Sequence, residues 1–167
     1  MYRRPACMGA LIANGGTPAP IGVPDDGVPL ANDGFWPDIA LGALRAATRL
    51  TGNVTPARLR AAAIEAMLDV NAQLAIAKAR WVGQGWTSAA DVGDTVAGAS
   101  AIVHRYQRAL ASTVQADLAE KYRDWDSTRA GDYRADAESV AADDFRRNAQ
   151  WAIADLLGRP RNVVVLI

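Results

Sequence analysis

The feature of this sequence that most restricts its fold is the spacing of apolar residues after Pro37. Between positions 56 and 82 they recur at alternating steps of four and three, in the series Ala63, Met67, Val70, Leu74, Ala77 and Trp81. Such spacing places the side chains on one face of an α-helix, whereas a half-buried strand would alternate with a period of two. The sequence therefore predicts a helix that buries this face against another helix.

Helix boundaries are also marked in the sequence. A first helix is expected over about 38–50, with Gly52 as its stop. A second is expected over about 55–82, because Thr55 is a suitable N-cap and Pro56 would occupy the first helical position, where no N–H is needed.

Two longer helices are expected over about 99–125 and 132–157, with Gly158 closing the second. The apolar face of the former comprises Val103, Tyr106, Leu110, Val114, Leu118 and Tyr122. That of the latter comprises Ala137, Val140, Phe145, Ala149, Ala152 and Leu156. Short connections favour antiparallel neighbours, so we expect an all-α fold with an antiparallel four-helix bundle-like core over residues 38–158.

Residues 1–37 differ from this core in composition, because they contain six of the eight prolines and six of the fourteen glycines. We interpret them as an extended N-terminal arm. Its short apolar pieces at 11–13 and 21–23 are too brief to pack alone, and turn residues follow at Asp25 and Asp26. The arm either orders by pairing with a neighbouring molecule or is a disordered tail.

The last nine residues, 159–167, form a separate segment. Two arginines, Arg159 and Arg161, flank Pro160, and a β-branched, uncharged run follows at Val163, Val164, Val165, Leu166 and Ile167. This short tail resembles a β-strand, and the helical core is predicted to offer no strand as its partner. It either docks on another molecule or folds back onto its own bundle.

Composition limits the possible functions. Eighteen basic residues balance eighteen acidic residues, which argues against a uniformly cationic nucleic-acid-binding protein. The single cysteine, Cys7, has no partner within the chain for a disulfide. We predict no signal peptide and no membrane span, because the longest apolar runs are far shorter than the roughly 20 residues that cross a bilayer.

No catalytic constellation is visible in the sequence. The single histidine, His104, has no acid or nucleophile at helical spacing. The pair Asp143 and Asp144 would point about 100° apart on a helix, so the two carboxylates would not converge on one ion. We therefore predict that the chain is not an enzyme and uses no metal or cofactor.

Several motifs, taken together and in order, resemble a known family. They are Phe35–Ile39, Val54–Arg60, Tyr122 with Arg123, Asp126 with Ser127, Gly131 with Asp132, Arg134–Asp136, Trp151 with Ala152, and Arg159–Arg161 before a final isoleucine. In this combination residues 35–167 resemble the head completion protein family, gpL type, of temperate contractile-tailed phages. The resemblance implies a structural virion protein at the head–tail vertex of the capsid, assembled in the cytoplasm of the bacterial host.

The resemblance further implies a head-to-tail connector, a homo-oligomeric ring usually of twelve subunits. Its partners would be the portal protein and a tail terminator or tail-proximal connector, with transient, non-specific contact with the exiting genomic DNA. For such a ring we expect residues 159–167 to bind the portal, and we select Glu65, Asp69, Arg105 and Arg108 as channel-lining candidates. Pairs of arginines such as Arg146 and Arg147 leave an alternative, a DNA-binding helical module for packaging or retention.

Overall fold

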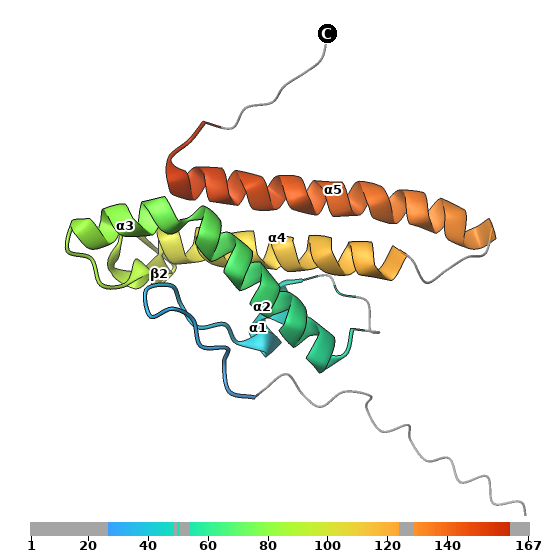
Figure 1. Cartoon of the computed structure of the whole chain (residues 1–167), viewed down its shortest axis with the longest axis horizontal. Helices are drawn as coiled ribbons and strands as arrows, with labels where there is room; N and C mark the ends of the chain where they lie inside the picture. The colour runs from blue at the N-terminus through green and yellow to red at the C-terminus, as the bar shows by residue number, and fades with distance from the viewer. Residues whose placement is uncertain (1–26, 49, 51–53, 124–128, 161–167) are drawn as a thin grey trace, which may run out of the picture.

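A computed structural model describes residues 27–48, 50, 54–123 and 129–160, with side chains omitted for 122–141. Within these ranges the protein is mostly helical and carries one small sheet (Figure 1). The helices are α1 (Leu41–Ala47), α2 (Pro56–Gln73), α3 (Ala75–Gly83), α4 (Ala101–Arg123) and α5 (Arg129–Leu157). A 3-10 turn, η1 (Ala89–Asp91), and the strands β1 (Thr95–Val96) and β2 (Ala99–Ser100) lie between α3 and α4.

Helix α2 begins where the sequence predicts. The Thr55 hydroxyl oxygen accepts a hydrogen bond from the Arg58 N–H at 3.3 Å, and Pro56 is the first helical residue. The expected single helix is divided, however, because Leu74 leaves the helical conformation at φ −93° and ψ 3° and separates α2 from α3. All six seam residues are nevertheless buried, which confirms the predicted apolar face.

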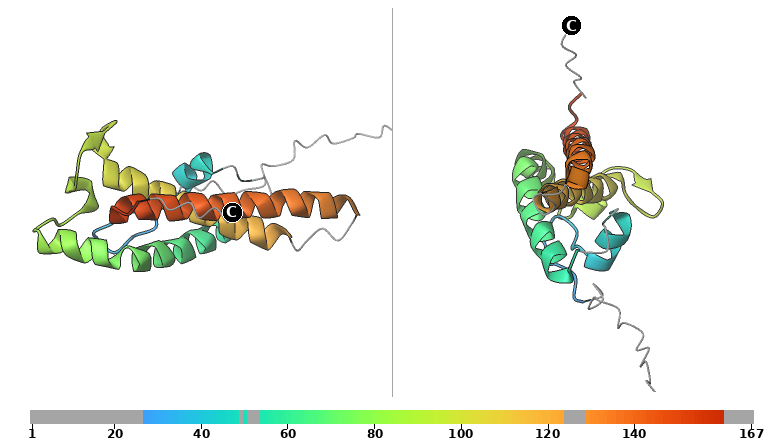
Figure 2. Two further views of the ribbon diagram at one scale, coloured as in Figure 1. Left: turned by 90° about the horizontal axis from the view of Figure 1, so that it is seen from above. Right: turned by 90° about the vertical axis from the view of Figure 1, so that its right-hand side faces the viewer.

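The principal helix pair consists of α4 and α5, which run side by side in Figure 1 and are adjacent when seen end-on in Figure 2. The apolar face predicted for α4 is buried from Val103 to Leu118. On α5, Ala149, Ala152 and Leu156 are buried, and Phe145 is half-buried. Helix α2 also packs on α4, so α4 lies between two neighbours for part of its length.

The sheet was not predicted from the sequence. Strands β1 and β2 pair antiparallel, with Thr95 opposite Ser100 and Val96 opposite Ala99. Ala97 and Gly98 form the turn with φ values of 49° and 82°, a conformation in which glycine is free of strain. The structure thus shows a mostly helical fold with a two-stranded hairpin, and a four-helix bundle is not confirmed.

The segment before α1 is part of the core. Leu30 and Ile39 exchange backbone hydrogen bonds of 2.9 Å in both directions, and Leu30, Phe35 and Trp36 are buried. Because Ile39 is held in this bridge, the first helix begins at Leu41 rather than at residue 38. Part of the sequence assigned to the arm therefore packs against α2 to α4, whereas residues 1–26 lie outside the described ranges.

Candidate interaction site at the end of helix α5

Helix α5 ends in a turn that sets the position of Arg159. Gly158 adopts φ +67°, where an L side chain would be strained. Its N–H donates to the Asp155 carbonyl oxygen at 3.3 Å, and the Arg159 N–H donates to the Ala154 carbonyl oxygen at 2.9 Å. This pair of bonds is the Schellman pattern, which satisfies the last carbonyls of a helix and reverses the chain sharply.

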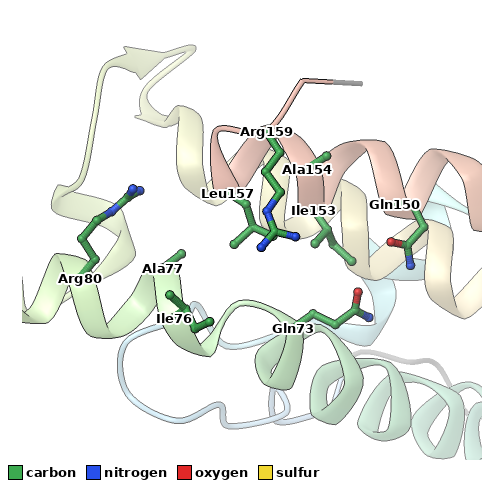
Figure 3. A pocket seen from close by; sticks show the side chains of 9 residues that line it. All are labelled: Gln73, Ile76, Ala77, Arg80, Gln150, Ile153, Ala154, Leu157 and Arg159. Atoms are coloured by element: carbon green, nitrogen blue, oxygen red, sulfur yellow. The ribbon is translucent and has the colours of Figure 1, made fainter. Parts of the chain in front are cut away.

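The reversal leaves a pocket of about 300 Å³ between α3 and the last turns of α5 (Figure 3). Its apolar wall is formed by Ile76 and Ala77 on one side and by Ile153, Ala154 and Leu157 on the other. In Figure 3 the Arg159 side chain reaches in between the two helices. The remaining lining residues are Gln73, Arg80 and Gln150.

The charge of this pocket is one-sided. Arg159 and Arg80 line it, and no acidic residue does. Arg80 stands at one end and lies 5.6 Å from the ring centroid of Trp81, a cation–π contact. Within the described part of the chain, neither guanidinium has a carboxylate as an ion-pair partner. An apolar wall with two arginines and no acid among the lining residues favours an occupant that is apolar and acidic.

The α3 side of the pocket is tied to the segment that precedes α1. Lys78 of α3 forms a 2.7 Å ion pair with Asp33. The other carboxylate oxygen of Asp33 accepts from the backbone N–H groups of Phe35 and Trp36, each at 3.1 Å. Partial burial would raise the pKa of Asp33, but the hydrogen bonds from Lys78, Trp36 and Phe35 together outweigh it and lower the pKa. The carboxylate is thereby kept charged and α3 is held in place.

A closed triangle of side-chain hydrogen bonds joins the segment before α1 to α2 and α4. Asn32 donates to the Tyr106 hydroxyl, Tyr106 donates to Asn71, and Asn71 donates back to Asn32, each at 2.8 Å. Burial raises the pKa of Tyr106 to about 12. The hydrogen bond from Asn32 lowers this pKa, whereas the negative charge of nearby Asp33 raises it. The phenol therefore stays neutral and can act as both donor and acceptor at neutral pH.

Comparison with known proteins identifies the family. The model of the phage head completion protein (GPL) family matches residues 30–167. The chain belongs to this family. It is also similar to the head completion/stabilization protein of Escherichia phage P2, at 37% identity over 136 residues, which cover 81% of this chain and 80% of that relative. No solved structure gave a significant match.

The structure of this head completion protein describes only the first two residues of the predicted portal-binding tail. Arg159 and Pro160 are exposed at the end of α5, and Arg159 also lines the pocket. The rest of the tail, Arg161 and Val163–Ile167, lies outside the described residues. The pocket is a feature that the sequence does not predict. Its one local signal was Ile76, an aliphatic residue off the buried seam, which is 79% exposed.

The four channel candidates are all exposed. Glu65 and Asp69 are one turn apart on α2, and Arg105 and Arg108 are one turn apart on α4. No ion pair joins the two sets within the described ranges. Glu65 and Asp69 therefore form an exposed acidic pair on α2 of the head completion protein, and Arg105 and Arg108 form an exposed basic pair on α4.

The single histidine and the paired aspartates form ordinary hydrogen bonds and ion pairs. His104 places its Nε2 atom 2.8 Å from the Val96 carbonyl oxygen, next to the hairpin turn. Asp143 and Asp144 pair with Arg146 and Arg147, at 2.9 and 2.7 Å. In the part of the chain that the structure describes, no cluster of potential metal ligands occurs. None of the helices described there is both long and apolar enough to cross a bilayer.

Proposed function

We propose that this head completion protein is a ring-forming connector subunit between the portal and the tail. The ring has twelve subunits and binds the portal on one side and a tail terminator or tail-proximal connector on the other. Its position is the head–tail vertex of the virion, where it completes the DNA-filled capsid. Family membership supports the head completion role, and the geometry of the subunit supports the connector role.

The observation that carries this proposal is the arrangement of the two chain exits. The described chain starts at residue 27 on the face of the molecule opposite α5, and it leaves α5 through residues 158–160 on the other face (Figures 1 and 2). Each subunit can therefore extend one segment in each of two opposite directions. A subunit that must contact one component above it and another below it needs such an arrangement.

The tail at residues 159–167 supplies the portal contact in this proposal. In this contact Arg161 can pair with acidic portal residues, and the valine-rich run offers apolar area and backbone hydrogen-bonding groups. The Schellman turn at Gly158 supports this role because it directs the chain away from the axis of α5.

A channel that releases DNA must not grip phosphates strongly, because counterion release would hold the duplex. Several basic groups on α4 and α5 are neutralised by neighbouring acids: Arg146 by Glu120 and Asp143, Arg147 by Asp144, and Lys121 by Asp117. We propose a lumen of mixed charge to which Glu65, Asp69, Arg105 and Arg108 contribute. These pairings also count against the alternative of a dedicated DNA-binding module.

Electron microscopy of the purified protein mixed with its portal tests the proposal. The expected image is a ring of this protein stacked coaxially on the portal, with inward-facing acids beside the arginines. Portal alone is the control. A protein that stays monomeric with portal present, or a lumen lined almost entirely by Arg and Lys, contradicts the proposal.

A further inference from the structure

We infer that the pocket between α3 and the end of α5 receives residues 21–26 of a neighbouring copy of the chain. These residues are Ile21, Gly22, Val23, Pro24, Asp25 and Asp26. The inference rests on the ring assembly proposed above, and it names the contact that would join one subunit to the next.

The first argument is the chemistry of the pocket wall. Ile76 lines the pocket and is 79% exposed, so a large aliphatic side chain is left open to solvent there. It faces Ile153 and Leu157 across a space of about 300 Å³, which is the lower end of the size range of ligand pockets. The aliphatic side chains of Ile21 and Val23 match this wall, and covering Ile76 removes apolar area from water.

The second argument is charge. Arg80 and Arg159 are the charged groups of the pocket, and both are exposed. In the arm, two carboxylates follow the aliphatic pair after Pro24, at Asp25 and Asp26, so one short segment supplies both kinds of contact. The protein's own C-terminal tail fits less well, because residues 160–167 contain no acidic side chain and add Arg161.

The third argument is the position of the chain entry. The described chain begins at residue 27 on the face opposite α5, whereas the pocket lies beside α5 (Figures 1 and 2). Asp26 is one residue from that start, and consecutive Cα atoms are 3.8 Å apart. Asp25 and Asp26 therefore cannot reach the pocket of their own subunit. The start of the described chain and the pocket lie on different faces, so a contact that joins them between copies is heterologous, the type from which rings are built.

A binding assay without portal tests this contact. A fluorescent peptide of residues 18–29 is titrated with the full-length chain carrying Asp25→Lys and Asp26→Lys, whose own arm no longer competes. We expect saturable binding that weakens about five- to tenfold with Arg159→Glu, because one ion pair is replaced by repulsion. Arg60→Glu, an exposed substitution on α2 away from the pocket, is the matched control and should bind as the parent does.

Exchanging the charges of peptide and pocket gives the decisive experiment. A peptide with lysines at positions 25 and 26 should bind the Arg80→Glu and Arg159→Glu receptor better than the native peptide does, with circular dichroism confirming that each receptor is folded. The inference is overturned if the native peptide does not bind, if Arg159→Glu leaves its affinity unchanged, or if a peptide of residues 160–167 binds there instead. Because no portal is present, these outcomes are independent of whether a ring stacks on the portal.

Discussion

The ring of Trp36 stacks on the ring of Tyr106, with centroids 4.5 Å apart and planes inclined by 8°. Trp36 belongs to the segment before α1 and Tyr106 to α4, so the contact joins parts of the chain that are distant in sequence. Phe35 and Trp81 complete this aromatic cluster, and the Tyr106 hydroxyl extends it into the hydrogen-bonded triangle with Asn32 and Asn71. The cluster joins α3, α4 and the entering chain, and the triangle adds α2 through Asn71.

Replacing Tyr106 by Phe should therefore destabilise the protein without removing the stacked ring. The substitution leaves the side-chain oxygen of Asn71 without its donor and the side-chain amide of Asn32 without one acceptor. The free energy of unfolding should fall by about 1–3 kcal/mol. Urea unfolding measures the difference. Trp86→Phe, at a 42% exposed aromatic, is the control and should change stability by less than about 0.5 kcal/mol. An equal effect of the two substitutions would contradict this account of the triangle.

The raised pKa of the Tyr106 hydroxyl leads us to expect that the free energy of unfolding decreases at alkaline pH. The folded-state pKa of Tyr106 is about 12, above the ordinary value of 10.0. A raised pKa means that the stabilisation is fully present below pH 10 and is lost as the pH rises through 12. Unfolding free energies of the wild type and Tyr106→Phe, measured from pH 8 upward, should converge across this window. A constant difference between the two proteins would show that Tyr106 ionises normally.

Truncation after Gly158 should leave the core folded and abolish portal attachment. Among the removed residues that the structure describes, Arg159 contributes one backbone hydrogen bond to the end of α5, from its N–H, so helix content and melting should change little. Occupancy of the truncated protein on portal-containing heads, measured by quantitative gel analysis, should fall to background. Normal occupancy would show that residues 159–167 do not dock on the portal.

The arm should be cleaved in the free subunit and protected after assembly. Because Leu30, Phe35 and Trp36 are buried, cleavage of the free subunit should stop before residue 30. Limited proteolysis followed by mass spectrometry locates the sites in free protein and in isolated connectors. Protection in the connectors follows if the arm gains a partner on assembly. Identical cleavage in both states would remove the case for an intersubunit arm.

Local chemistry in the sequence determined the helix faces and several helix ends. The seam from Ala63 to Trp81 is buried as predicted, because a period near 3.6 specifies one face of a helix whatever that face packs against. Thr55 and Gly158 act within one turn of their own position, so the start of α2 and the end of α5 were also predictable.

Tertiary structure decided which segments meet. The burial of Trp36 depends on contacts with residues far away in the sequence, and local periodicity indicates neither the break at Leu74 nor the hairpin at residues 95–100. The pocket is the clearest case, since Ile76 and Ile153 are far apart in sequence and face each other only because α5 and α2, which leads into α3, both pack on α4. A single sequence specifies which faces must be buried, but the choice of partner for each face is a property of the packed core.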